Sequence, residues 1–140
     1  MLGETLFDRT TIPVLTKTLD ASMLRSRTIA NNIANINTPG YQRVEVNFED
    51  ELKKALEGHE LQGMRTDDKH LPLGQSDISE LNATVSKPVD PTLPSGVNNV
   101  DIENEMAKLA ETQIEYNFAA KFLKGKFSAL NAAIQQKSIQ

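Results

Sequence analysis

The sequence contains no cysteine and no tryptophan, and aromatic residues make up only 5% of its 140 residues. Without cysteine, the chain has no disulfide scaffold, no cysteine-based zinc site and no thiol nucleophile. A compact core usually contains more bulky side chains, so this composition favours long helices packed by aliphatic residues. A chain of this length holds one domain.

Long hydrophobic runs are also absent: no stretch approaches the roughly 20 apolar residues of a membrane span. The first residues, MLGETLFDRT, have no basic region followed by an apolar run, so we expect no cleaved secretory signal. The net charge of −4 argues against nucleic acid as a partner. No glycine-rich phosphate loop and no GxSxG motif is present, so we expect no enzyme activity, no small-molecule substrate and no cofactor.

Histidine is scarce, and the one cluster that resembles a metal site is Asp67-Asp68-Lys69-His70. One histidine and two adjacent acids in a polar loop do not preorganise a metal ion. We therefore interpret the cluster as a solvated loop and expect no metal. A metal-dependent enzyme that uses His70 remains as a remote alternative.

Apolar and small residues recur at heptad spacing from about Thr11 to Ile36, which predicts a long helix that packs along another helix. Thr10 or Thr11 can cap its start, and Pro13 is tolerated in a first turn. Thr38-Pro39-Gly40 ends it, because Pro39 and Gly40 suit the centre of a type II turn. The predicted seam contains Ile12, Leu15, Leu19, Ser22, Ser26, Ile29, Ile33 and Ile36.

A second heptad pattern covers the C-terminal region, where Asp101 is a plausible N-cap. The predicted seam contains Ile102, Met106, Leu109, Gln113, Tyr116, Ala120, Leu123, Phe127, Leu130 and Ile134. A further apolar set lies on the roughly opposite side of the same helix and is predicted to be a subunit interface: Ala107, Ile114, Phe118, Phe122, Ala129 and Ala133. A helix that is apolar on two faces needs a larger bundle or other chains.

The sequence therefore predicts a mainly all-α fold in three parts. Residues 1–36 form the N-terminal helix of the core, and residues 101–140 form a C-terminal helix antiparallel to it. Residues 37–100 form a turn, a short helix and an irregular, loop-rich excursion. In that excursion, Asn47 can cap a helix that presents Phe48, Leu52 and Leu56 on one face and ends at Gly58. Thr84-Val85-Ser86 can form a short strand.

Asparagines crowd the end of the N-terminal helix in the run ANNIANINTPGY. Asparagine is a poor helix former, so one interpretation is a frayed and capped helix terminus. The other is that the amides bind neighbouring chains, with Asn31 and Asn35 acting together from one helix face. The sequence alone leaves both interpretations open.

The run ANNIANINTPGYQR resembles the signature of the rod and hook proteins, the axial family of the bacterial flagellum. The C-terminal stretch NNVDIENEMAKLAETQIEYNFAAKFLKGKFSALNAAI resembles the matching terminal motif and points to the proximal rod subfamily usually designated B. A sister rod subfamily fits less well at Ile114 to Asn117. The signature positions in this chain are Asn31, Asn32, Asn35, Asn37, Thr38, Pro39, Gly40 and Tyr41.

The resemblance implies a structural subunit of the flagellar basal-body rod, the shaft that transmits torque from the membrane ring to the hook. It implies polymerisation with copies of itself and other rod proteins, next to the ring-to-rod adaptor, the export gate and the membrane ring. It also implies a periplasmic location and type III export without a cleaved signal. The alternative class is a cytoplasmic helical-hairpin adaptor or export chaperone, which would not need the second apolar face.

Overall fold

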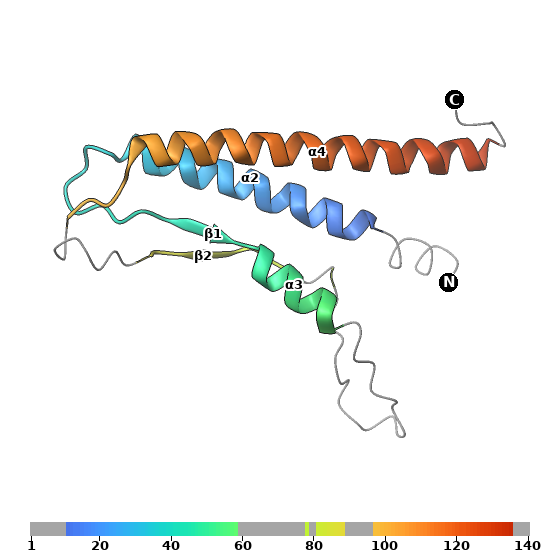
Figure 1. The fold of residues 1–140 in the computed structure, drawn as a ribbon, viewed down its shortest axis with the longest axis horizontal. Coiled ribbons are helices and arrows are strands. Elements are labelled where there is room, and N and C mark those ends of the chain that lie inside the picture. Colours follow the sequence, from blue (N-terminus) through green and yellow to red (C-terminus); the bar gives the residue numbers. More distant parts are fainter. Residues whose placement is uncertain (1–10, 59–77, 79–80, 89–96, 136–140) are drawn as a thin grey trace, which may run out of the picture.

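The structure is a computed structural model that describes residues 11–58, 78, 81–88 and 97–135. In chain order, its elements are helix α2 (Ile12–Ala34), strand β1 (Glu45–Asn47), helix α3 (Glu49–Gly58), strand β2 (Thr84–Ser86) and helix α4 (Ile102–Ile134). Helices α2 and α4 lie side by side and run antiparallel, and the strands and α3 lie together on one side of this helix pair (Figure 1). This confirms the predicted mainly helical fold with two long packed helices.

Helix α2 begins one residue after Thr11 and ends two residues earlier than predicted, at Ala34. Thr11 occupies the N-cap position, but its side chain makes no capping hydrogen bond. Pro13 lies in the first turn, where its missing N–H leaves no intrahelical bond unmade. The C-cap is Asn35, whose backbone N–H donates to carbonyl oxygens of the last helical turn.

The chain reverses at Thr38 to Tyr41, as predicted. Gly40 has a φ of 72°, and the backbone N–H of Tyr41 donates to the carbonyl oxygen of Thr38 over 3.3 Å. A positive φ at the third position is the requirement of a type II turn, and glycine adopts it without a Cβ clash. This turn sends the chain back along α2 into β1.

The two strands pair antiparallel, with Glu45 opposite Ser86, Val46 opposite Val85 and Asn47 opposite Thr84. Strand β2 lies where Thr84-Val85-Ser86 predicted it. Strand β1 was not predicted, although Arg43 to Asn47 alternates polar and apolar residues. Val46 is buried, which fixes the strand pair to the rest of the molecule.

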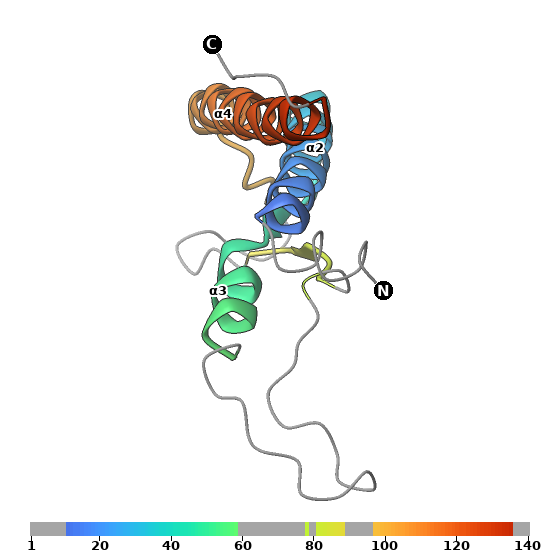
Figure 2. The ribbon, with the colours of Figure 1, turned by 90° about the vertical axis from the view of Figure 1, so that its right-hand side faces the viewer.

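Helix α3 corrects the predicted details of the short helix. It begins one position later than an Asn47 cap implies, since Asn47 ends β1 and its amide donates to the Ser86 hydroxyl over 3.1 Å. Phe48 and Ala55 are buried, whereas Leu56 is exposed. Figure 2 shows α3 on the opposite side of the molecule from α4.

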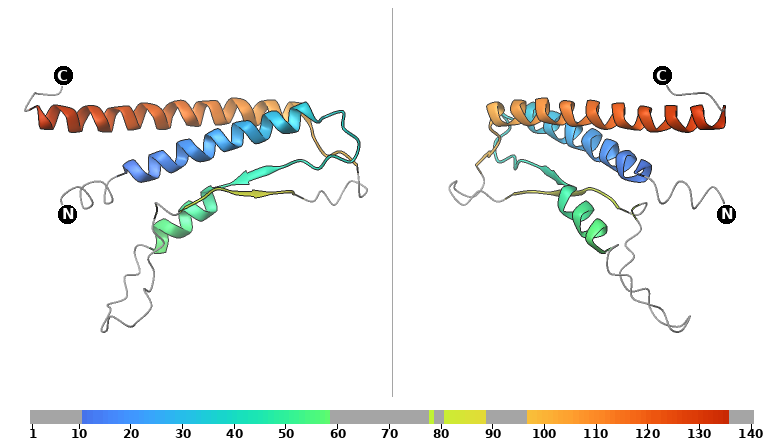
Figure 3. Two further views of the ribbon diagram at one scale, coloured as in Figure 1. Left: turned by 180° about the vertical axis from the view of Figure 1, so that it is seen from behind. Right: turned by 45° about the vertical axis from the view of Figure 1, so that its right-hand side comes forward.

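Helix α4 begins at the predicted cap: the Asp101 carboxylate accepts hydrogen bonds from the backbone N–H groups of Glu103 and Asn104. Its fully buried residues are Glu105, Thr112 and Ala119, seven residues apart. Figure 3 shows that the C-terminal end of α4 extends past the start of α2. No helix in the described residues is both long and apolar enough to cross a membrane.

The packed face of α4 is shifted from the predicted seam: the buried residues Glu105, Thr112 and Ala119 each come one position before a predicted seam residue. Leu109, Tyr116, Leu123 and Leu130 are half-buried, but Ile102, Met106 and Phe127, which were predicted inside the seam, are exposed. The reason is the surface that α2 offers, which includes the small or polar Ala21, Ser22, Thr28 and Asn32 besides Ile29. The small side chains of Thr112 and Ala119 let α4 approach this surface of α2 closely. The Glu105 carboxylate accepts a hydrogen bond from the Asn32 amide.

The predicted seam of α2 is packed more nearly as expected. Ser22 and Ile29 are buried, and the remaining seam positions are half-buried: Ile12, Leu15, Leu19, Ser26, Ile33 and, beyond the helix, Ile36. On α4, Gln113 and Ile134 are exposed and Ala120 is half-buried. The helix pair is therefore tightly packed near the end of α2 and loosely packed near its start.

Candidate functional site

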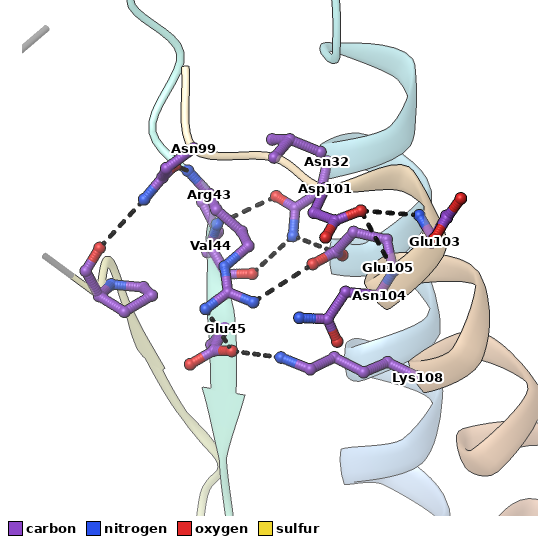
Figure 4. A network of polar contacts seen from close by, with 12 residues as sticks. Asn32, Arg43, Val44, Glu45, Asn99, Asp101, Glu103, Asn104, Glu105 and Lys108 are labelled. Atoms are coloured by element: carbon purple, nitrogen blue, oxygen red, sulfur yellow. Dashed lines mark hydrogen bonds and ion pairs between the residues drawn. The ribbon is translucent and has the colours of Figure 1, made fainter. Parts of the chain in front are cut away.

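Asn32 lies at the centre of a buried polar junction between α2, β1 and α4 (Figure 4). Its side chain is completely buried, with 0% exposure. The amide nitrogen donates to the Val44 carbonyl oxygen (2.8 Å) and to Oε2 of Glu105 (2.9 Å). The amide oxygen accepts from the Val44 N–H (3.0 Å) and from the Tyr41 hydroxyl (3.1 Å). One side chain thus saturates its hydrogen-bonding capacity and ties three segments together.

Glu105 enters this junction from α4 and is only 1% exposed. Arg43 stands on the other side of it, with 3.6 Å between Nη1 and the Glu105 Oε1. The Arg43 guanidinium also pairs with Glu45 at 2.9 Å, and Glu45 pairs with Lys108 of α4 at 2.5 Å. A buried carboxylate is tolerated when its charge is paired and hydrogen-bonded, and here Oε1 faces the Arg43 guanidinium while Oε2 accepts from the Asn32 amide.

The pKa of Glu45 reflects its place in this chain of charges. Burial raises the pKa, but the hydrogen bond from Lys108 and the charges of Arg43 and Lys108 outweigh that effect and leave it below its ordinary value. The ionised form is therefore favoured in the folded chain. This keeps a salt bridge between β1 and α4 through the neutral and mildly acidic range.

Asn98 closes the end of α2 from the segment that leads into α4. Its amide nitrogen lies within hydrogen-bond distance of the carbonyl oxygens of Asn35 (2.8 Å), Ile36 (2.8 Å) and Thr38 (3.0 Å). These carbonyls follow the last helical turn and lack intrahelical partners. Asn98 therefore acts as a capping residue supplied from a distant part of the sequence.

Neighbouring polar residues extend this cap. The Asn99 side-chain oxygen accepts from the Arg43 N–H over 2.6 Å, and its amide donates to the Pro88 carbonyl oxygen over 3.3 Å. The Gln42 amide donates to the carbonyl oxygen of Val97 over 2.9 Å. The segment before α4 is thus bonded to the segment after α2, which aligns the two helices.

Arg25 forms a second link farther along the helix pair. Its guanidinium bonds Glu115 of α4 at 3.0 Å and also pairs with Glu49 at the start of α3. Burial raises the pKa of Glu49, but the hydrogen bond from Arg25 and other lowering contributions leave it below its ordinary value. Arg25 connects three helices, although the exposure of Glu49 limits what that pair contributes.

The signature residues divide between the interior of this junction and its surface. Asn32 and Tyr41 form its centre. Asn35 donates to the Asn31 carbonyl oxygen and accepts from the Thr38 hydroxyl, so its side chain serves the helix end. Exposed positions are Asn31, Asn37, Thr38, Pro39 and Gly40.

The capped-terminus interpretation describes Asn35, whereas Asn32 lies inside α2 and bonds other segments of the same chain, which neither interpretation foresaw. The amide of Asn35 is occupied within its own turn, so Asn31 and Asn35 do not form a joint pair of amides on the surface. A contact between the exposed Asn31 and a neighbouring chain stays a prediction.

Sequence reasoning missed the partners of the asparagines. Glu105, Arg43 and Asn98 are polar, and patterns of apolar periodicity assign polar residues to the solvent face. The signal that could have found Glu105 is its place one turn after the Asp101 cap, where a carboxylate at the start of one helix can reach the end of its antiparallel neighbour. Asn98 and Asn99 precede that cap in the sequence, but no pattern there indicates which residues they contact.

An open groove of about 390 Å³ lies beside the junction, between α2, β1 and α4. Its charged lining is Arg25, Glu45, Glu49, Glu105, Lys108, Glu111 and Glu115. Both basic side chains are already paired with its acids. In the described ranges, no group of three or more acidic or histidine side chains could hold a metal ion. The Asp67 to His70 cluster lies outside those ranges.

The predicted subunit interface on α4 is uncovered in the single chain. Ile114, Phe118 and Phe122 have exposed fractions of 57%, 58% and 62%, and Ala129 and Ala133 are exposed as well. Three large apolar side chains on successive turns form a continuous patch. Contiguous exposed apolar patches of this kind mark sites of protein–protein interaction.

Comparison with known proteins identifies the family of the chain. A family model described as flagella basal body rod protein matches residues 14–42, which contain the turn through Gly40 and all of α2 except its first two residues. The flagellar basal body rod protein FlgB of Bacillus subtilis (strain 168) is 32% identical over 124 residues, covering 89% of this chain and 92% of the relative. The chain belongs to the flagellar basal body rod protein FlgB family. FlgB of Borrelia hermsii is 34% identical, over 84% of this chain and 90% of its own, and FlgB of Proteus mirabilis (strain HI4320) is 29% identical, over 80% and 84%.

Membership in the FlgB family confirms the interpretation of the terminal motifs. The chain is a structural component of the flagellar rod and is located in the flagellar basal body. The alternative of a cytoplasmic adaptor or chaperone is not favoured. The match to the flagella basal body rod protein model ends at Gln42, so it includes Asn32 and the turn but not Glu105 or Asn98, which the structure adds to the same junction.

Proposed function

We propose that this rod protein polymerises helically, with copies of itself and with other rod proteins, into the proximal part of the shaft that transmits torque from the membrane ring to the hook. The observation that carries this proposal is the exposed apolar patch of Ile114, Phe118 and Phe122 on α4. Within the described residues, the patch lies beside the packed face and has no cover, while the family assigns the chain to an assembled rod.

Burial of the patch gives the energy for assembly. Burying a fully exposed side chain of this size contributes about 1.5–3 kcal/mol. Each of the three side chains would contribute less than that on assembly, because each is already partly buried in the free chain. Contacts repeated from one copy to the next, without a closing symmetry, generate an open helical polymer. The buried junction has a different task in this proposal: it holds α2 and α4 as one rigid unit, so that torque passes through the hairpin without shearing it.

The finer location follows from the same proposal. The subunit is exported by the flagellar type III apparatus without a cleaved signal and assembles on the periplasmic side of the inner membrane. Its neighbours there are the ring-to-rod adaptor, the export gate and the membrane ring. The motif resemblance and the family support these neighbours, and crosslinking in isolated basal bodies tests them.

The decisive variant is Phe118→Asp, which places a charge in the patch and leaves the α2–α4 contact intact. We expect the protein to be made and exported, yet to be absent from the rod, so that cells are non-motile. Phe118→Leu is the matched control and should keep motility. Leu123→Asp, on the packed side of α4, should instead lower the helicity of the purified chain. A motile Phe118→Asp strain with complete basal bodies would contradict the proposal.

A further inference from the structure

The charges on α4 are separated along its length. Residues 101–115 hold five acids and one lysine, and residues 116–134 hold three lysines and no acid. Within the N-terminal half, Asp101 caps the helix, and Glu105, Lys108 and Glu115 pair with other elements. The charges left over, all exposed, are Glu103, Glu111, Lys121, Lys124 and Lys126. None of these five forms an ion pair with a residue that the structure describes.

The helix dipole does not explain this separation. Its influence is confined to the first and last turns of a helix. Glu103 lies in the first turn of α4, but the last turn has no basic residue, and Lys126 lies about two turns before the end at Ile134. Glu111 is likewise an interior residue. Among the residues that the structure describes, the basic cluster and Glu111 therefore have no ion-pair partner, and they have no helix end to complement.

Gly125, within the basic half, is also unexplained by the single chain. Glycine is disfavoured in the interior of a helix, yet a Cβ added at this position would meet nothing within 4 Å. At 100° per residue, Gly125 lies on the same side of α4 as Ile114 and Phe118. A glycine on an exposed face allows the backbone of a neighbouring helix to approach closely.

We propose that the occupant of this face is a second copy of the chain: the basic half of α4 of one copy lies along the acidic half of α4 of the next. The copies then contact one another head to tail with an axial offset. Parallel packing without an offset would place lysines against lysines, and such like-charge contacts select against a wrong register. The proposal rests on the self-assembly proposed above and adds its register and polarity.

The geometry of α4 gives the size of the offset. Glu103 and Lys121 lie about five helical turns apart, so they occupy the same side of the helix about 27 Å from each other along the axis. An offset of this size places Lys121 of one copy beside Glu103 of the next. The same offset brings the glycine-containing part of the face over the first turns of the neighbouring α4.

Disulfide crosslinking tests the register, and the absence of native cysteine makes it clean. Full-length Lys121→Cys and Glu103→Cys chains are purified, concentrated and oxidised singly and as a mixture. We expect a crosslinked dimer in the mixture at least tenfold above either variant alone, decreasing several-fold as salt is raised. Asp20→Cys, an exposed position on α2, replaces Lys121→Cys in the control mixture. Self-crosslinking of Lys121→Cys at the mixture's level would show in-register packing and overturn the proposal, as would no crosslink above the control.

Charge exchange tests the partner. One variant carries Lys121→Glu and Lys124→Glu, and the other carries Glu103→Lys and Glu111→Lys. Each alone should lower incorporation into basal bodies at least tenfold, and co-expression of the two should restore most of it. Defects without mutual rescue would mean that the lysines face a different protein, which overturns the proposal. If these variants assemble normally while Phe118→Asp does not, the charge pairing is wrong but the patch remains the interface. A motile Phe118→Asp strain would overturn the proposed function itself.

Discussion

The two halves of α4 have opposite relations to the rest of the chain. The N-terminal half contains the buried residues Glu105 and Thr112 and joins α2 and β1 through hydrogen bonds and ion pairs, and the buried Ala119 lies just past the middle of the helix. In the C-terminal half, Ala120 and Leu123 line a shallow crevice together with Leu19 of α2. The large residues Phe122 and Phe127 of this half are mostly exposed. One continuous helix thus begins as part of a core and ends as a surface.

This difference shows how a polymer subunit can be both ordered and incomplete. The first half is fixed by contacts within the chain, so every copy presents the same geometry. The second half keeps its apolar and basic side chains exposed, and in the proposed assembly its helical form would depend more on packing supplied by neighbours. The junction defines the shape of the subunit, and in the same proposal the second half extends the surface on which copies meet.

Hydrogen exchange should show the contrast most directly, as a large difference in rate along one helix. In the dilute chain, backbone amides of α4 between Glu105 and Ala119 should exchange about 100-fold more slowly than those after Leu123. This corresponds to about 3 kcal/mol of additional local stability, at about 1.4 kcal/mol for each tenfold change. Circular dichroism should accordingly report less helix than α2 and α4 contain when packed. Uniform protection along α4 would contradict the comparison.

Asn32→Ala is the variant expected to damage the ordered half most. It leaves the Val44 backbone groups, the Tyr41 hydroxyl and the Glu105 carboxylate without their buried partner. The free energy of unfolding should fall by about 3–5 kcal/mol, since each unsatisfied buried group costs about 1–3 kcal/mol and some will recover water.

The control for this variant is the neighbouring, exposed Asn31→Ala, which should change stability by less than about 0.5 kcal/mol. Urea unfolding followed by circular dichroism measures both. Equal effects of the two substitutions would show that the junction is not what stabilises the helix pair.

The glycines of the two regions should respond in opposite directions. Gly40→Val places a β-branched residue at a φ of 72° and should destabilise the chain by about 1–3 kcal/mol. Gly125→Ala should stabilise the free chain by about 0.5–1 kcal/mol, because it removes a poor helix former from a position with open space.

In cells the same two variants separate folding from assembly. Gly40→Val should reduce motility because the chain no longer leaves α2 in the native direction, and Gly40→Asn, which tolerates a positive φ, should restore it. Gly125→Ala should weaken assembly in spite of its more stable helix. Normal basal bodies with Gly125→Ala would remove the argument for close approach at that position.

The smallest effect expected is that of pH on the ordered half. The pKa values of Glu45 and Glu49 lie below their ordinary value of 4.5 in the folded chain. Their contribution is therefore complete above about pH 4.5 and is lost as the pH falls through the lower, folded values. Since both groups are partly exposed, the loss should be at most about 1 kcal/mol. Glu45→Gln should flatten the dependence of unfolding free energy on pH between 5 and 3, and an unchanged slope would argue against the Glu45–Lys108 pair.

Most of the fold was predictable because its signals are local. The heptad recurrence from Ile12 to Ile33 and the cap at Asp101 depend on neighbours within one or two turns, and so does the turn at Pro39-Gly40. Strand β2 followed from Thr84-Val85-Ser86. The start of α3 and the side on which Leu56 lies were wrong by about one position, since a ten-residue helix offers few residues to fix its phase.

The sequence by itself determined the two long helices, the reversal between them and the apolar patch of Ile114, Phe118 and Phe122, because spacing along a helix assigns residues to faces before any partner is known. The tertiary structure decided which face of α4 meets α2. That choice depends on Asn32, Glu105 and Arg43, which come from three separate segments. A buried carboxylate is costly alone and stable only beside its amide and guanidinium partners, and the place of Glu105 after the helix cap does not by itself show which residues of other segments will be those partners.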